Sequence, residues 1–380
     1  MSNYTNTTIP QLLSIRRPLS LGVCAVALLT CHAAVAAESS IEFGLSGEAS
    51  YDDNRYLSST NKQDVYIFRI NPSVGILMED EGSETLFSVF GSYALSSDQL
   101  VQEDRFNYGG SVTGNYQFEY SSLSLAAGYN HDSVLDTEFE DTGIFSNNAT
   151  RDSGNASFGY ETSLSETWSL RVSDNFQVMD YSSLVFNNFW SNRAGMGVDV
   201  LINERTALVQ DFSYLRYEPE NVLAPTRNSY SYLAGLRHDL SENTRMTVTG
   251  GVSYLDDVYR WSAVAELVHE LENNQLSVRA AREIQPSGLG GLKQDESISF
   301  DTTYNYSLST NMGLTASWRR SKSLDNFIAF DNEFIGFSPW VSFEVMRDLN
   351  VRLRYHLRRQ KIGITNDWGI SNSFYISIEY

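Results

Sequence analysis

Trp368–Tyr380 reads WGISNSFYISIEY, and this stretch decides the fold. Apolar side chains alternate in it with small or polar ones, giving one row of Trp368, Ile370, Phe374, Ile376, Ile378 and Tyr380 and a second row of Gly369, Ser371, Ser373, Ser377 and Glu379. Only Asn372 and Tyr375 interrupt the alternation. A period of two predicts a β-strand whose two faces meet different environments.

The unpaired edge of this last strand indicates whether the sheet lies in water or in a membrane. A long apolar edge strand in a soluble sheet invites aggregation. In a transmembrane barrel the last strand pairs with the first, so every backbone group is hydrogen-bonded and no edge remains. The row Phe374, Ile376, Ile378 and Tyr380 also resembles the C-terminal signal that the barrel assembly machinery reads in bacterial outer-membrane proteins. We therefore expect an all-β transmembrane barrel.

Residues 1–37 have the three parts of a secretory signal peptide. Arg16 and Arg17 are their only Lys, Arg, Asp or Glu residues, an apolar run covers 19–29, and small residues fill 34–37. We expect cleavage after Ala36 or Ala37 and one mature domain, residues 38–380. A membrane-anchoring helix would need a longer apolar run. A lipoprotein would be lipidated at Cys31, but such a site needs a small residue before the cysteine, and Thr30 fits this requirement poorly.

The composition excludes several classes of protein. Both cysteines lie in the leader, so the mature chain can form neither a disulfide nor a thiolate metal site. Without the two leader arginines it holds 25 Lys and Arg residues against 47 Asp and Glu residues, a net charge of −22. Nucleic acid is therefore not an expected partner. The 22 Tyr, 20 Phe and only 7 Pro favour strands. The remaining alternative is a secreted soluble β-protein, a solenoid or propeller.

The rest of the chain repeats the terminal pattern. In residues 105–120 aromatic, valine and glycine residues alternate strictly with polar ones, as expected for a lipid face with aromatic girdles. Eight short turns alternate with nine longer polar segments, among them 53–64, 131–152, 286–294 and 360–367. We predict an antiparallel barrel of about 18 strands (16–18), with short periplasmic turns, longer extracellular loops and a porin-sized lumen.

A basic ladder is predicted on one wall of the lumen. Between residues 351 and 358 apolar side chains alternate with Arg352, Arg354, His356 and Arg358. Such a row can guide an anionic solute, or it can pair with carboxylates across the lumen and stiffen the wall. Further candidate lumen residues are Arg279, Arg319 and Glu344, together with Trp340 and Tyr375 as inward rings for a sugar path.

Catalytic and metal sites are not indicated. The four mature histidines lack metal-ligand spacing, and His131 and the adjacent Asp132 must point to opposite faces of a strand. We expect neither an enzyme nor a cofactor. Asp132, Asp136, Glu138, Glu140 and Asp141 could bind calcium but lack EF-hand spacing, so we predict a solvated acidic loop near lipopolysaccharide.

Two short stretches resemble a known family. Tyr51-Asp52-Asp53-Asn54, at the end of the first strand, resembles a signature of β-barrel porins encoded with exopolysaccharide biosynthesis and export systems of Gram-negative bacteria. Gln285-Pro286-Ser287-Gly288-Leu289-Gly290, followed by Asp295, resembles a late loop of the same family. The resemblance implies export of a biofilm or capsule polysaccharide through the outer membrane, with periplasmic export proteins as partners. It implies no catalytic residue.

Three functions are consistent with these patterns. The first is a conduit or accessory porin for exopolysaccharide export. The second is a general or solute-selective diffusion porin in which an inward-folded loop, such as residues 131–152, forms a constriction. The third is a non-conducting barrel whose loops bind a surface partner. Conductance separates the third function from the other two, and gene context separates the first two.

Removal of residues 374–380 should abolish membrane insertion, because the barrel then lacks its closing strand. The measurement is heat-modifiable migration of the protein in outer-membrane fractions. Normal insertion of the truncated chain would contradict the role of the terminal strand.

Overall fold

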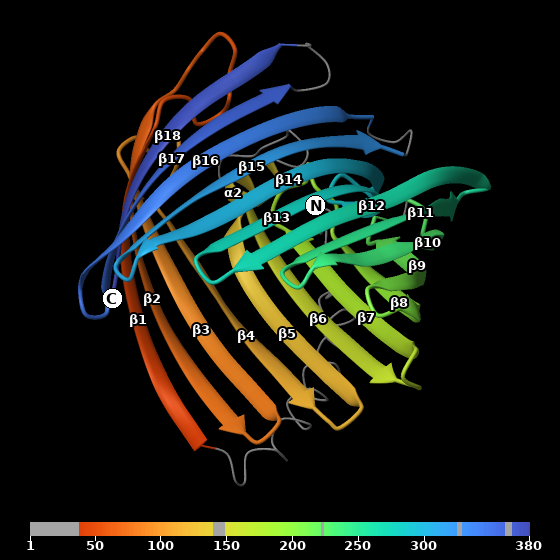
Figure 1. Ribbon diagram of the computed structural model, residues 1–380. Helices are drawn as coiled ribbons and strands as arrows, with labels where there is room; N and C mark the ends of the chain where they lie inside the picture. The colour runs from red at the N-terminus through yellow and green to blue at the C-terminus, as the bar shows by residue number, and fades with distance from the viewer. Residues whose placement is uncertain (1–37, 140–148, 222–223, 325–328, 362–366) are drawn as a thin grey trace, which may run out of the picture.

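The computed structural model describes residues 38–139, 149–221, 224–324, 329–361 and 367–380. The predicted signal peptide, residues 1–37, and residues 140–148 of the predicted acidic loop lie outside these ranges. Within them no helix is long and apolar enough to cross a membrane. The described chain is instead a ring of tilted strands that follow one another in sequence order (Figure 1).

The ring contains 18 antiparallel strands, as predicted, and one short helix. The elements are β1 (Glu38–Asp52), β2 (Val65–Asp80), β3 (Ser83–Ser96), β4 (Arg105–Gln117), β5 (Ser121–Ser133), α2 (Val134–Thr137), β6 (Thr150–Ser163), β7 (Trp168–Tyr181), β8 (Phe189–Asn203), β9 (Thr206–Pro219), β10 (Arg227–Ser241), β11 (Thr244–Leu255), β12 (Val258–Leu271), β13 (Asn274–Ser287), β14 (Gly291–Ser307), β15 (Thr310–Ser323), β16 (Asp331–Met346), β17 (Leu349–Lys361) and β18 (Trp368–Glu379).

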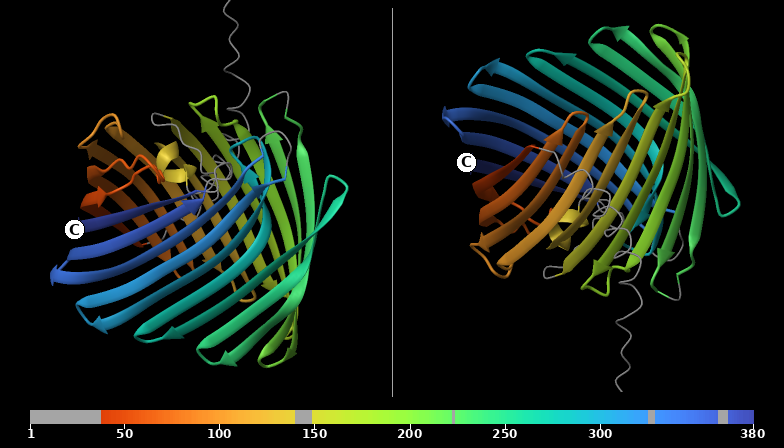
Figure 2. Two further views of the ribbon diagram at one scale, coloured as in Figure 1. Left: turned by 90° about the horizontal axis from the view of Figure 1, so that it is seen from above. Right: turned by 90° about the horizontal axis from the view of Figure 1, so that it is seen from below.

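The sheet closes on itself between its first and last strands. β1 pairs with β2 on one side and with β18 on the other, in a register that sets Tyr51 opposite Phe374. The backbone N–H of Tyr380 donates to the carbonyl of Leu45 at 3.0 Å, and the N–H of Leu45 donates back at 3.0 Å. Figure 2 shows the blue C-terminal strands beside the red and orange N-terminal ones. The chain is thus a closed antiparallel β-barrel.

The two faces of the ring differ as the alternation predicted. Apolar side chains stand exposed on the outer face; Phe43 is 77% exposed and Phe374 is 55% exposed. The alternate residues of the same strands, such as Ser50, Ser371 and Ser373, are buried on the inner face. An exterior of this kind is stable against lipid and would be unfavourable in water.

Connections of two lengths mark the two ends of the barrel. Eight short connections join β2 to β3, β4 to β5 and so on to β17, and define the turn end. The remaining connections define the loop end. Two of these loop-end connections are as short as the turns at the other end. Only Asp256 and Asp257, both at positive φ, join β11 to β12. The predicted loop 286–294 is wrong: three residues suffice there, because Gly290 adopts φ +97° and lets the chain reverse.

A hydrophobic core occupies the inside of the barrel at the loop end. It combines lumen-facing residues of β7 to β9 with residues of α2 and of the β13–β14 hairpin, and its members include Val134, Met179, Tyr181, Phe189, Leu215, Tyr217, Ile284, Leu289 and Leu292. Figure 2 shows α2 within the ring of strands. The loop-end segments therefore fold into the lumen and pack there.

Candidate functional site

The predicted basic ladder faces the lumen. Arg352, Arg354, His356 and Arg358 of β17 pair in register with Ser377, Tyr375, Ser373 and Ser371 of β18. These residues of β18 alternate with the exposed, lipid-facing Ile370, Phe374 and Ile376. The four basic side chains consequently share the inner wall, although their environments differ along the strand.

At the loop end of the ladder the charge is fully engaged. The side chain of Arg358 is 6% exposed and forms an ion pair with Asp52 of β1. Asp52 also accepts a hydrogen bond of 2.5 Å from the hydroxyl of Ser371. Arg358 thus ties β17 to β18 and β1, which corresponds to the structural alternative considered for the ladder.

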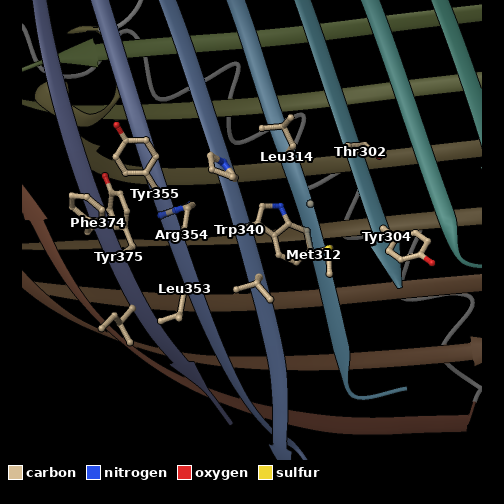
Figure 3. Close-up of a pocket in the computed structure, with 14 residues that line it drawn as sticks. Thr302, Tyr304, Met312, Leu314, Trp340, Leu353, Arg354, Tyr355, Phe374 and Tyr375 are labelled. Atoms are coloured by element: carbon tan, nitrogen blue, oxygen red, sulfur yellow. The ribbon is translucent and has the colours of Figure 1, made fainter. Parts of the chain in front are cut away.

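At the turn end the arginines lie over aromatic rings. The guanidinium of Arg354 is 4.3 Å from the ring centre of Tyr375, and that of Arg352 is 4.7 Å from the ring centre of Trp340. Arg354 lies between Trp340 and Tyr375 in the strand register, as Figure 3 also shows. Its Nη2 is 3.4 Å from Glu48, and its side chain remains 41% exposed. We call Trp340, Arg352, Arg354 and Tyr375 the arginine–aromatic row.

One cation of the row is not held in an ion pair. Within the described residues, Arg352 forms no ion pair, and its residue is exposed. Gly313 leaves room for the indole of Trp340 to lie against the neighbouring strand, because a Cβ at this position would stand 2.6 Å from the indole. Stacking on an aromatic ring orients a guanidinium and leaves its N–H groups able to bind an anion.

The other predicted lumen residues are dispersed. Arg279 of β13 lies 3.5 Å from Glu283, and Arg319 of β15 lies 3.8 Å from Asp295. Glu344 is exposed near the turn end of β16. The structure therefore brings Trp340 and Tyr375 to the ladder and leaves Arg279 and Arg319 apart from it, whereas Glu344 lies opposite Asn350, two positions before Arg352.

The family-like stretch at Tyr51–Asn54 forms the seam of the barrel. Asp53 accepts hydrogen bonds of 2.7 Å from the backbone and side-chain nitrogens of Asn372. The side chain of Asn54 donates to the carbonyl of Ile370 at 2.8 Å. Asp52 holds Arg358, as described above. The polar residues of this stretch thus join β1 to β17 and β18 rather than facing a ligand.

An acidic segment is latched to the lumen wall. Asp136 of α2 forms ion pairs with Arg55, from the connection after β1, and with Arg105 of β4, and it lies 4.0 Å from Arg69 of β2. A few residues on, the side chain of Gln360 in β17 donates to the carbonyl of Phe139 at 2.9 Å. The segment 134–139 therefore contacts several strands that are not its neighbours in the ring. We call it the latch segment, and its ion pairs through Asp136 the latch.

This latch corrects the prediction of a solvated acidic loop. Asp132 and Glu138 lie 2.9 Å and 3.1 Å from Arg151, and Asp136 is held by arginines as well. No group of residues suited to a metal ion is found in the part of the chain that the structure describes. Glu140 and Asp141 lie outside that part. The missed signal was the pair of arginines near the loop ends, Arg55 and Arg105, each of which follows two acidic residues in sequence and yet pairs with the distant Asp136.

The latch keeps its charge at ordinary pH. Burial by itself would raise the pKa of the Asp136 carboxyl, but the positive charges of Arg55, Arg105 and Arg69 outweigh burial and hold that pKa well below its usual range. For Arg55, burial opposes the charged form and Asp136 favours it, with a raised pKa as the result. Both partners are therefore ionised across the physiological range.

A second inward segment comes from the other family-like stretch. Residues 287–294 are all buried, and we call residues 284–294 the hairpin tip. The carbonyl of Ser287 accepts from the Tyr217 hydroxyl at 3.3 Å, that of Ile284 from Arg193 at 2.7 Å, and that of Gly288 from the Asn187 amide at 2.7 Å. Tyr217 and Arg193 belong to β9 and β8, and Asn187 lies in the connection between β7 and β8, so the tip crosses the lumen to this side of the barrel.

Two pockets lie near these features. One, of about 870 Å³, is lined mostly by lipid-facing side chains such as Leu353, Tyr355 and Phe374 and is mainly a depression of the outer wall, although Trp340, Arg354 and Tyr375 of the row also border it (Figure 3). The other, of about 430 Å³, lies between the hairpin tip, the latch segment and the wall of β6 to β8. Only the second belongs to the lumen.

His131 does not form a dyad with its sequence neighbour. Its Nδ1 is 2.8 Å from Asp152 on β6, and its ring stacks on Tyr108 at 4.9 Å, whereas Asp132 binds Arg151. The predicted opposite orientation of His131 and Asp132 is confirmed.

Comparison with known proteins gives a likeness of fold. No protein-family model matches the chain, and no curated protein matches it in sequence. Among solved structures it is similar to the ferric enterobactin receptor (PfeA) of Pseudomonas aeruginosa, at 11% identity and a TM-score of 0.49, over 89% of this chain and 80% of that one. It is also similar to OccAB4 of Acinetobacter baumannii, at 11% identity and a TM-score of 0.47, over 90% of this chain and 98% of that one. The outer membrane protein opdK of P. aeruginosa is similar at 8% identity and a TM-score of 0.46, over 90% of this chain and 99% of that one. The likeness concerns the ring of strands alone.

Asp136→Asn should release the latch segment from the wall. The variant loses charged hydrogen bonds that are each worth about 1.5–3 kcal/mol, so we expect larger or more frequent conductance steps in a planar bilayer. Asp104→Asn is the matched control, because Asp104 is a carboxylate at the same end that bonds Ser96 and Gln99 and leaves the latch untouched. Conductance equal to that of the unmodified protein would contradict the latch.

The latch should resist mild acid. A carboxyl whose pKa is lowered by folding contributes stability above its unfolded pKa, near 4, and loses it only as the pH falls through the folded value. We therefore expect the same open fraction at pH 5 and pH 8. Opening between these values, measured in the same bilayer assay, would show that another group controls the segment.

Proposed function

We propose that the protein is an outer-membrane channel with a narrowed lumen that selects anionic solutes, acidic saccharides in particular. The observation that carries this proposal is the arginine–aromatic row on the inner wall. Arg352 is exposed and Arg354 is partly exposed; Trp340 and Tyr375 orient them, and of the two only Arg354 forms an ion pair within the described residues. A carboxylate on a sugar would pair with the guanidinium, while the ring offers an apolar surface to the sugar.

Selective passage suits this lumen better than general diffusion. An 18-stranded ring is wide enough for an aqueous pore unless segments fold into it. Here the latch segment and the hairpin tip both do so, and buried hydrogen bonds and ion pairs hold them. A solute must therefore pass close to wall residues, where charge and hydrogen bonding discriminate between solutes.

Export of an exopolysaccharide is a more specific form of this proposal. Its support is the resemblance of Tyr51–Asn54 and Gln285–Gly290 to porins encoded with polysaccharide export systems. Periplasmic export proteins, lipopolysaccharide and the barrel assembly machinery would then be the partners. Because Gln285–Gly290 lies in the hairpin tip that crosses the lumen, a polymer could pass only after this tip moves aside.

The test is single-channel recording of the purified protein in a planar bilayer with an acidic oligosaccharide, oligogalacturonate, on either side. We expect anion-selective steps that the sugar blocks. In Arg352→Gln/Arg354→Gln the blocking constant should rise by about tenfold or more, since each 1.4 kcal/mol of lost binding is tenfold.

The matched control is Arg347→Gln, because Arg347 is a 96% exposed arginine at the turn end. Anion selectivity and block that survive in the double variant would contradict the role of the row. Large steps that are indifferent to every sugar would identify a diffusion porin, and silence would identify a non-conducting barrel with a surface role.

A further inference from the structure

The polar pocket beneath the hairpin tip is distinct from the arginine–aromatic row. Its volume is about 430 Å³. Four parts of the chain enclose it: the latch segment, the wall of β6 to β8, the hairpin tip with the adjoining β14, and Arg319 of β15. None of the residues that line it belongs to the row. We call it the tip pocket.

We propose that the tip pocket binds a neutral saccharide of one or two rings. This proposal goes beyond the proposed function and uses it only in that the solute enters through the lumen. The volume falls within the range of about 300–1,000 Å³ that is typical of small-molecule sites. Enclosure on several sides gives a solute more contact than an open pore wall can.

The charges around the tip pocket nearly cancel, which disfavours an ion as the ligand. Arg151, Lys293 and Arg319 line it with Glu138 and Asp295, and Asp132 pairs with Arg151 from outside the lining. Arg151 is flanked by Asp132 at 2.9 Å and Glu138 at 3.1 Å. Arg319 lies 3.8 Å from Asp295. A second anion would meet these carboxylates, and a second cation would meet the arginines. A neutral ligand avoids both repulsions.

Hydroxyl groups match the polar lining. A sugar hydroxyl both donates and accepts hydrogen bonds, and the lining offers acceptors in Glu138 and Asp295 together with donors in Arg151 and Arg319. The amides of Gln177 and Gln285 lie in the same pocket and can do both. A ligand with many hydroxyls can use such a mixed set fully, and a ligand with one functional group cannot.

An apolar side completes the tip pocket. Met179, Phe189 and Pro286 line it next to the polar groups. Met179 and Phe189 belong to the buried core at the loop end, which fixes their positions. The C–H face of a sugar ring packs on surfaces of this type, which supply shape and exclude water.

The pocket is organised before any ligand arrives. The Tyr181 hydroxyl donates to Glu138 at 2.8 Å, which together with Arg151 fixes the carboxylate. Gly288 lets the tip approach this pair, since a Cβ there would stand 2.6 Å from the Tyr181 hydroxyl. A preorganised site loses less entropy on binding, so a small neutral ligand can still bind with useful affinity.

The experiment is calorimetric titration of the detergent-solubilised barrel with maltose as the neutral probe and digalacturonate as the acidic one. We expect maltose to bind, and Gln177→Leu/Gln285→Leu to weaken that binding by about tenfold or more. Gln275→Leu is the control, because Gln275 lies on the same strand as Gln285, at the turn end and away from the pocket. Unchanged maltose binding in the double variant would overturn the proposal.

Two further readouts keep the outcome decisive. In the unmodified protein maltose should slow amide hydrogen exchange in residues 284–294 and 134–139, and exchange that does not change would also overturn the proposal, whether or not the double variant folds. Maltose binding that persists in Arg352→Gln/Arg354→Gln would separate this site from the row. Binding of digalacturonate alone, lost in that variant, would leave the proposed function standing and refute the tip pocket.

Discussion

Closure of the sheet is the constraint on which the rest of the structure depends. In a membrane every backbone N–H and C=O must be paired within the protein, so a sheet can span it only as a ring. In this chain the ring closes between β1 and β18, where Leu45 and Tyr380 exchange backbone hydrogen bonds, and side chains reinforce the closure. Asp52 binds Arg358 and Ser371, while Asp53 binds Asn372. A stretch that looks like a recognition motif thus serves the joint on which closure depends.

Closing 18 strands creates an inner space that the strands alone cannot fill. The chain fills the loop end of this space with segments of its own: α2 is drawn in by Asp136, and the hairpin tip is bound to the opposite wall. The two segments meet at Glu138, because a Cβ at Gly288 would stand 3.3 Å from its carboxylate and both residues line the tip pocket. Movement of either segment would therefore disturb the other. The turn end keeps its polar residues more exposed, which is where the arginine–aromatic row lies.

Features that depend on alternation could be predicted from the sequence. The strand number, the outward row of Phe374, Ile376 and Ile378 and the inward direction of Arg352, Trp340 and Tyr375 all follow from a period of two. What could not be predicted depends on contacts between distant residues. Nothing near Asp136 in sequence indicates that Arg55 and Arg105 reach it, and nothing near Arg358 indicates Asp52. The Pro and Gly residues of 286–294 favour a loop, but they suit a tight hairpin equally well. Only pairing with neighbouring strands distinguishes the two.

The ladder on β17 shows why residue type and spacing alone do not define a site. Its four basic residues share one face and one spacing, yet Arg358 is buried in an ion pair that supports the seam, whereas Arg352 is exposed and lies on an indole. The difference comes from the ion pairs: Asp52 at the loop end of β1 binds Arg358, whereas Arg352 forms no ion pair within the described residues. Because β1 supplies Asp52 only when the ring is closed, closure itself divides the ladder into a structural half and a half that can meet a solute. The selectivity that we propose for the lumen would then be a consequence of the seam.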